Sequence, residues 1–152
     1  MNQYILLRDK HQKMVHEFPF GFAYNNEQFD KMMEKWGLGA EDIYTIVEFS
    51  PGTYYQEKDS EKLLKLMEQI DQETKEAIAS DKTGEGYIYD MFYEELANHE
   101  YCINLSLRPT LETLGLTIEE VNADPRLLHG LRKARIDYLK EIYPEEMKEA
   151  GY

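Results

Sequence analysis

Residues 81–92 have the residue types and spacing of a calcium-binding loop. Oxygen-bearing side chains fall at the first, third and fifth ligand positions of an EF-hand pattern: Asp81, Thr83 and Glu85. The twelfth position of that pattern is a Glu that supplies two carboxylate oxygens, and this chain has Phe92 there. Glu94 and Glu95 come too late in the chain to replace it. The stretch therefore resembles a calcium loop that lacks its strongest ligand, and we expect no calcium site.

The same stretch also fits a connection between two helices. Gly84 and Gly86 would supply positive φ angles, and either Asp81 or Thr83 would cap the helix that follows. We favour this structural role over ion binding.

Glu95 and His99 are four residues apart, so a carboxylate and an imidazole share one face of a predicted helix. Together with Asp81 they make up a competing hypothesis, a metal-dependent module or small enzyme. Two side chains do not complete a metal site, and Cys102 has no nearby histidine except His99. We therefore expect no catalytic residue, no bound metal and no cofactor, and we interpret the chain as an interaction protein rather than an enzyme.

Acidic residues and tyrosines are concentrated in the middle of the chain. Residues 57–100 hold 13 acidic and 5 basic residues, out of 30 and 17 in the whole sequence. Carboxylates beside large, rigid rings would bind a basic partner, whereas the same rings could instead fill the core, and the sequence leaves both roles open. The predicted partner-binding residues are Glu68, Asp71, Glu73, Glu76, Glu85, Tyr87, Tyr89 and Glu94.

Composition restricts the class of protein. The chain has 152 residues, 42% of them hydrophobic, which predicts a single domain over 1–152 with one core. Cys102 is the only cysteine and no long apolar run occurs, so we expect a cytoplasmic protein with no disulfide and no membrane segment. A net charge of −13 opposes direct binding to nucleic acid or to an anionic membrane. The one basic cluster is expected to pair with acids of the same chain: Arg126, Arg132, Lys133 and Arg135.

Hydrophobic periodicity predicts a mostly helical α+β fold with a small antiparallel sheet. Apolar and aromatic runs bounded by turn residues predict strands near 20–24, 43–49 and 53–56. Apolar residues at helical spacing predict helices at 3–17, 27–36, 60–80 and 88–99, short helical turns at 110–114 and 118–121, and a long helix from Pro125 until Pro144 breaks it. Residues 101–107 fit an edge strand about as well as a loop.

Several segments carry a resemblance to known proteins: Phe18–Tyr24 with Gln28 and Phe29, residues 79–92, residues 95–101, Ala123–Arg126, and Gly130 with Leu131. Together they resemble a family of small uncharacterised proteins associated with plasmids, integrative elements and phages of gut Firmicutes and Bacteroidetes. The resemblance covers nearly the whole chain and implies no activity for any residue. It implies a setting, because small acidic proteins of mobile elements often act against host defence.

Charge, tyrosine content and this setting predict a non-enzymatic acidic interaction protein of a mobile element that binds a basic protein surface. The expected partner is a DNA-acting nuclease, whose nucleic-acid site the carboxylates would occupy, as in an anti-CRISPR or anti-restriction inhibitor. Two alternatives stay open. One is the metal-dependent module described above, and the other is a homo-oligomeric regulatory protein with no nucleic-acid target.

Overall fold

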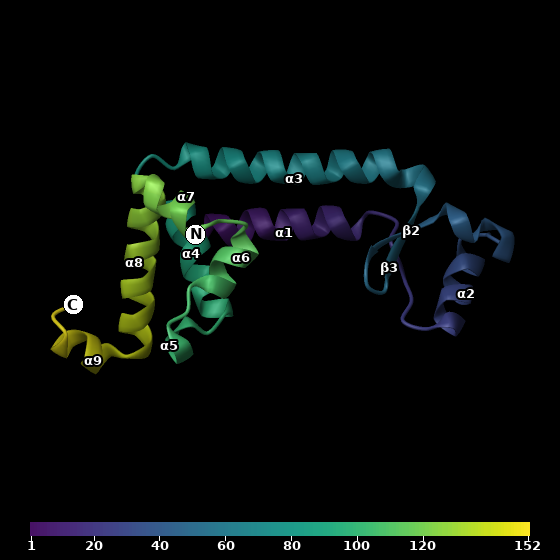
Figure 1. The fold of residues 1–152 in the computed structure, drawn as a ribbon. Helices are drawn as coiled ribbons and strands as arrows, with labels where there is room; N and C mark the ends of the chain where they lie inside the picture. Colours follow the sequence, from purple (N-terminus) through teal and green to yellow (C-terminus); the bar gives the residue numbers. More distant parts are fainter. The chain divides into compact units, whose positions relative to one another are not determined.

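The computed structural model describes residues 1–152, which pack as two compact units. The helical unit comprises residues 1–10 and 73–152, and the sheet unit comprises residues 11–72. Two long helices, α1 (Gln3–His16) and α3 (Ser60–Ser80), each contribute residues to both units (Figure 1). The single domain predicted over 1–152 stays a prediction. The residues pack as two units, but the continuous helices α1 and α3 contribute to both. None of the helices combines the length and the apolar character that a membrane span requires.

The fold is mostly helical with one small antiparallel sheet, which confirms the predicted class. The sheet has three strands in the order β1-β3-β2, namely β1 (Gly21–Phe22), β2 (Ile46–Ser50) and β3 (Thr53–Gln56). Pro51 and Gly52 form the turn between β2 and β3, as their residue types indicate. The strands lie in the three predicted segments, with β2 shifted toward the turn.

The predicted strand at 43–49 begins three residues later than expected. Residues Ala40–Thr45 form a 3-10 helix, η1. The Gly39 N–H donates to the Asp42 carboxylate at 2.9 Å, and the Asp42 N–H donates to the Gly39 carbonyl at 3.0 Å. These two local bonds start a helical turn and override the strand preference of the β-branched and aromatic residues that follow.

Helix α2 (Asn26–Lys35) packs against β1 and β3 in the sheet unit. The Asn25 side chain caps the helix by accepting a hydrogen bond from the Gln28 N–H at 2.8 Å. Met32 and Met33 are buried, and the Phe29 ring meets the Tyr54 ring edge-on with 5.3 Å between centroids. Four further rings of the sheet unit contact one another: Phe18, Phe20, Phe49 and Tyr55.

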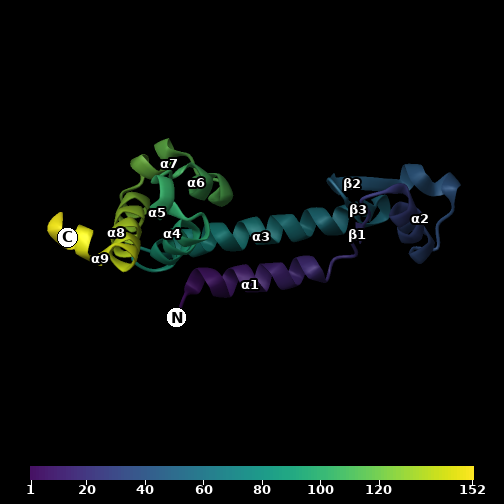
Figure 2. The same ribbon diagram turned by 90° about the horizontal axis from the view of Figure 1, so that it is seen from below.

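The helical unit is built around α4 (Tyr87–Asn98) and α8 (Pro125–Ile142), which lie side by side (Figures 1 and 2). Their facing sides supply most of one apolar core, which includes Ile88, Met91, Phe92, Leu96, Leu127, Leu131, Ala134 and Tyr138. The remaining helices are shorter: α5 (Tyr101–Asn104), α6 (Arg108–Leu114), α7 (Ile118–Ala123) and α9 (Pro144–Glu149). Burial of each large apolar side chain contributes about 1.5–3 kcal/mol, so this core is the main source of stability in the unit.

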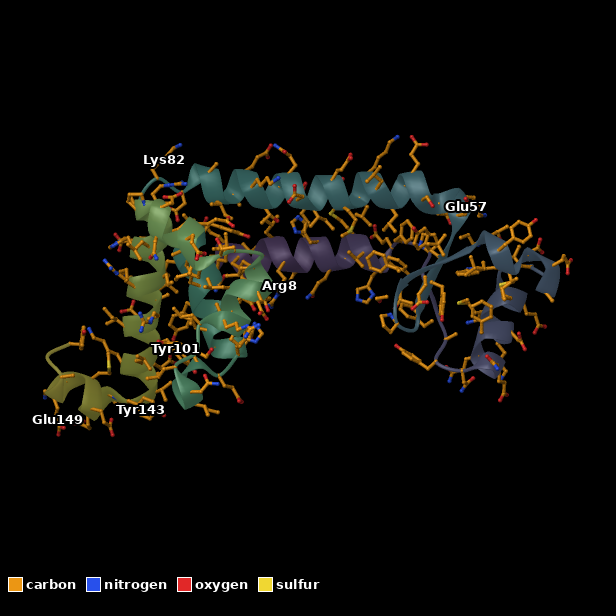
Figure 3. The ribbon with its side chains drawn as sticks, in the orientation of Figure 1. Arg8, Glu57, Lys82, Tyr101, Tyr143 and Glu149 are labelled. Carbon is orange, nitrogen blue, oxygen red and sulfur yellow. The ribbon has the colours of Figure 1, made fainter.

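The segment expected to be an edge strand or a loop, 101–107, contains the short helix α5 instead. Positive φ angles of 50° and 55° flank this helix, at Glu100 and Leu105. Tyr101, labelled in Figure 3, has a buried ring, and the Arg135 side chain of α8 donates from Nε to its hydroxyl at 2.9 Å. The left-handed residues at both ends exclude the extended backbone of a strand, and the buried ring anchors the helix to α8.

Candidate functional site

One buried carboxylate organises the connection between α3 and α4. Asp81 Oδ1 accepts hydrogen bonds from the N–H groups of Thr83 (3.2 Å) and Gly84 (2.8 Å). Its Oδ2 accepts from Gly86 and Ile88, both at 3.0 Å. Burial by itself would raise the pKa of Asp81, but these backbone N–H groups stabilise the charged form and hold the pKa below its ordinary value. Asp81 therefore caps α4, which confirms one of the two predicted caps.

The two glycines of this connection differ from each other. Gly84 has a φ of +89°, as predicted, whereas Gly86 has a φ of −99°, so the predicted positive φ at Gly86 was wrong. Gly86 is instead the N-cap residue of α4, and its N–H is one of the four donors to Asp81. Gly84 is the one left-handed residue of this turn, because four backbone N–H groups point toward the Asp81 carboxylate and set the path of the remaining residues.

The EF-hand-like positions serve the fold. Both oxygens of Asp81 accept hydrogen bonds from their own turn, and Phe92, at the twelfth position, is buried in the core. The chain has no cluster of three or more His, Cys, Asp or Glu side chains placed to hold a metal ion. The lack of calcium binding itself stays a prediction.

Residues 81–86, which connect α3 to α4, form the Asp81 turn. The backbone of this turn contacts the backbone at the start of α8. Gly84 lies so near the Arg126 carbonyl oxygen that a Cβ at residue 84 would overlap it. A Cβ at Gly130 would lie 2.6 Å from the Gly84 carbonyl oxygen. The Arg126 guanidinium pairs with Asp124 at 2.9 Å and also donates to two carbonyls at the end of α3 and the start of the turn, those of Ile78 (3.0 Å) and Asp81 (2.6 Å). The turn is thus held rigidly by glycine contacts and one arginine.

A second buried carboxylate, Glu95, lies in α4 and is only 4% exposed. The Tyr4 hydroxyl donates to Glu95 Oε1 at 2.9 Å, and His99 Nε2 lies 3.4 Å from Oε2 and 2.8 Å from the Thr113 hydroxyl. Burial, and then the hydrogen bond to Glu95, raise the pKa of Tyr4 well above its ordinary value. The structure brings Glu95 and His99 together, but they and Asp81 do not form a metal-binding cluster.

The four predicted partner-binding acids of α3 are divided between the two units. Glu68 and Asp71 are exposed residues of the sheet unit, and Glu76 is an exposed residue of the helical unit. Glu73 is partly buried, and its carboxylate pairs with the Lys10 ammonium at 3.0 Å. Lys10 therefore compensates the charge of Glu73.

Glu85 and Tyr89, also predicted to contact a partner, already contact α8. The Glu85 carboxylate lies 3.6 Å from both His129 and Lys133. The Tyr89 hydroxyl donates to Asp137 at 2.8 Å, and the Lys133 ammonium lies 4.6 Å from the centroid of its ring. Glu85 joins the turn before α4 to α8, and Tyr89 joins α4 itself to α8, so a partner would have to compete with contacts inside the chain.

Glu94 and Tyr87 complete the predicted set. Glu94 lies 3.6 Å from the Arg8 guanidinium. Tyr87 is only 4% exposed, and its ring packs edge-on against Tyr4 with 5.9 Å between centroids. Burial raises the pKa of Tyr87 to about 12. Tyr87 therefore belongs to the core and not to an exposed surface.

Most basic residues of α8 are engaged within the chain. Arg126 pairs with an acid, and the Lys133 ammonium lies 3.4 Å from Asp137, which confirms the predicted internal pairing for both. Arg135 contacts the Tyr101 ring and hydroxyl instead of an acid, and Arg132 is exposed. This helix therefore does not present its cations as one phosphate-binding surface.

The most exposed tyrosines lie in the sheet unit and were not predicted as site residues. Tyr24 and Tyr44 are 76% and 79% exposed, and Phe22 and Phe49 are exposed as well. The prediction favoured the tyrosines near the acidic middle of the chain, whose rings are all buried or partly buried in the structure. The sequence did carry a usable signal, because Tyr24 directly precedes the helix cap Asn25, and loop positions before a cap lie at the surface.

Carboxylates accompany these exposed rings. The sheet unit has 12 acidic and 6 basic residues. Its exposed acids include Glu34, Glu41, Glu48, Glu57 (labelled in Figure 3) and Glu68. Two of its lysines are in ion pairs along their own helices, Lys31 with Glu27 at 3.3 Å and Lys65 with Glu61 at 3.4 Å. The sheet unit thus combines excess negative charge with exposed aromatic surface.

A protein family described as "Family of unknown function (DUF7659)" matches residues 3–137. The chain belongs to DUF7659. Comparison with curated proteins and with solved structures finds no match.

The DUF7659 match includes the whole sheet unit, the Asp81 turn and α4, and it ends before α9. Membership of an uncharacterised family, which the sequence resemblance implied, is therefore confirmed. The origin of this DUF7659 chain in a mobile element stays a prediction.

Proposed function

We propose that this DUF7659 protein is a non-enzymatic acidic interaction protein that binds a basic surface of another protein through its sheet unit. The observation that supports this most is the presence of the two most exposed tyrosines, Tyr24 and Tyr44, on a unit with excess carboxylate. Tyrosine is enriched among the residues that anchor interfaces, and carboxylates at the rim accelerate association with a basic partner. The acids of the metal-dependent alternative, Asp81 and Glu95, are instead engaged in hydrogen bonds that stabilise the helical unit.

The partner in this proposal is a DNA-acting defence nuclease of the CRISPR or restriction type, and the protein acts in the cytoplasm. A site that binds DNA presents Lys and Arg to phosphates, and exposed carboxylates can take the place of those phosphates. The mobile-element setting implied by the sequence resemblance supports the same class of partner. The acids of the contact are Glu68 and Asp71 from the predicted set, together with Glu34, Glu41 and Glu48.

The test titrates the intact protein into cleavage reactions of guide-loaded nucleases and of restriction enzymes. One variant reverses three exposed acids of the sheet unit: Glu34→Lys, Glu41→Lys and Glu68→Lys. The matched control reverses three exposed acids of α9, beyond the residues of the family match: Glu145→Lys, Glu146→Lys and Glu149→Lys. Both variants change the net charge equally. We expect the wild-type protein to inhibit, the first variant to lose inhibition and the second to keep it.

The outcomes test two proposals separately: that the partner is a nuclease, and that the protein binds a basic partner at all. If no nuclease of either type is inhibited, the nuclease proposal fails. The broader proposal has its own readout, which is capture of a basic partner from cells that carry the gene, at low and at high salt. Capture should fall as salt rises, because screening weakens the attraction between carboxylates and a basic surface. A protein that forms only homo-oligomers by light scattering and captures nothing would favour the regulatory alternative.

A further inference from the structure

A groove in the sheet unit has the chemistry of a cation-binding site. It lies between the start of α2 and the β2–β3 hairpin and has a volume of about 450 Å³. Three aromatic residues line it, Tyr24, Phe29 and Tyr54, together with the acidic residue Glu48. No other residue that lines the groove carries a charge.

The Tyr24 side of the groove is fixed by the hairpin and by the cap of α2. The Tyr24 N–H donates to the Gln28 side chain at 2.8 Å, and the Ala23 N–H donates to the Gly52 carbonyl at 3.0 Å. Gly52 has a φ of +82°, and a Cβ at this position would overlap the Tyr24 ring. The ring therefore rests directly on the backbone of the hairpin turn, so its position is set before any partner binds.

The opposite side of the groove joins two rings to a carboxylate. Tyr54 and Glu48 are paired residues on neighbouring antiparallel strands, so their side chains lie on the same face of the sheet. The Phe29 ring meets the Tyr54 ring at 82°. This edge-on contact supports Tyr54 beside Glu48, which is exposed to solvent.

We propose that this groove binds the guanidinium group of an arginine side chain on the basic partner. The inference rests on the proposed binding function and names the contact that would anchor it. The faces of aromatic rings attract cations, and a carboxylate at the edge can accept two hydrogen bonds from the guanidinium fork. Arginine fits better than lysine, because its flat group stacks on rings and pairs with a carboxylate through two donors at once.

A second groove along α2 gives an internal comparison. It has a volume of about 410 Å³ and is also aromatic, with Phe22 and Trp36 among its lining residues. Lys31 and Lys35 line it too, so it would repel a cation. Aromatic lining occurs in both grooves, and the carboxylate in place of lysines is what makes the first one suitable for arginine.

The test follows amide signals of the intact ¹⁵N-labelled protein by NMR during titration with three short peptides. The peptides are identical except for one central residue, which is arginine, lysine or citrulline, the neutral isostere of arginine. We expect the arginine peptide to shift the signals of Tyr24, Phe29, Glu48 and Tyr54. The citrulline peptide should bind roughly tenfold more weakly, because it lacks the positive charge that both the rings and the carboxylate attract.

Variants with matched controls locate the effect. Glu48→Gln should weaken binding of the arginine peptide by roughly three- to tenfold, while Glu57→Gln, the same change at an exposed acid outside the groove, should leave it unchanged. Tyr24→Ala should also weaken binding, while Tyr152→Ala, which removes an exposed ring outside the groove and outside the proposed contact, should not. Thermal unfolding shows whether each variant folds, and Tyr24→Phe, which keeps the ring, should bind as the wild type does.

Equal affinity for the citrulline and arginine peptides would overturn the groove assignment, as would equal losses from the control substitutions. The triple reversal described above leaves Glu48 intact, so the two proposals can fail separately. If the triple variant loses its partner while Tyr24→Ala and Glu48→Gln keep it, the binding function stands and the groove does not. If the arginine peptide binds in the groove but no partner is captured, the groove assignment is supported and the proposed function is contradicted.

Discussion

Gly84 and Arg126 are in direct contact through their backbones, with the Gly84 α-carbon facing the Arg126 carbonyl oxygen at a separation that leaves no room for a side chain. The Arg126 guanidinium reaches back over the same turn and donates to the Asp81 carbonyl at 2.6 Å. The turn between α3 and α4 is therefore joined to the start of α8 by contacts in both directions.

Replacement of Gly84 by alanine should lower the free energy of unfolding by about 2 kcal/mol or more. Alanine at a φ of +89° is strained, and its Cβ would overlap the Arg126 carbonyl. Gly115→Ala is the matched control, because Gly115 has a φ of +67° with open space where the alanine methyl group would lie, and it should cost only about 1 kcal/mol. Urea unfolding measures both. Equal losses would mean that the contact with α8 adds nothing to stability.

Asp81→Asn should destabilise the fold by about 1–3 kcal/mol at neutral pH, because an amide cannot accept from all four N–H groups. The folded pKa of Asp81 lies below its ordinary value of 3.8, so the charged carboxylate stabilises the fold fully above that value. This contribution is lost as the pH falls through the folded pKa. The difference between wild type and variant, measured by thermal unfolding from neutral to acidic pH, should therefore shrink on acidification. A difference that stays constant with pH would show that the charge is not what matters.

Calcium should neither bind tightly nor raise the melting temperature of the wild-type protein. The hydrogen bonds to Asp81 occupy both of its oxygens, and Phe92 replaces the bidentate ligand. Titration calorimetry provides the measurement. A micromolar calcium site that disappears in Asp81→Ala would refute this expectation.

Tyr4→Phe should cost about 1–2 kcal/mol, because it removes the hydroxyl that donates to the buried Glu95 carboxylate. The pKa of Tyr4 is raised above its ordinary 10.0, so the protonated hydroxyl stabilises the fold fully below that pH, and the contribution is lost as the pH rises through the folded pKa. Wild type and variant should therefore approach each other in stability at strongly alkaline pH. Tyr44→Phe, at an exposed position, is the control and should be neutral throughout. An equal effect of both substitutions would rule out the Glu95 contact as the cause.

Local chemistry made much of the fold predictable. Asn25 is a residue type that favours helix caps, and it caps α2, while Pro51 and Gly52 are typical turn residues, and they join β2 to β3. In each case the signal lies in residues that are neighbours in the sequence. The prediction at 43–49 was less accurate, because strand preference could not reveal the hydrogen bond between Gly39 and the Asp42 side chain.

The candidate site was harder to predict because exposure depends on contacts between distant residues. Tyr87 and Tyr24 are the same residue type, yet one packs against Tyr4 and the other rests on Gly52 at the surface. Whether a charged side chain is solvated or paired is equally hard to predict from the sequence. The sequence around Glu85 is that of a solvated acid, whereas in the structure the Lys133 ammonium of α8 lies 3.6 Å from its carboxylate. Composition indicated an acidic protein rich in tyrosine, but only the fold shows which tyrosines and acids lie at the surface.

The sharing of α1 and α3 between the two units affects how the protein can be divided. Domains are usually separated in flexible, exposed linkers, whereas both boundaries here, after residue 10 and after residue 72, fall inside continuous helices. A protease or a truncation has no linker to cut at these points, so separating the units requires breaking helical hydrogen bonds twice. Each unit obtained alone would carry frayed helix ends.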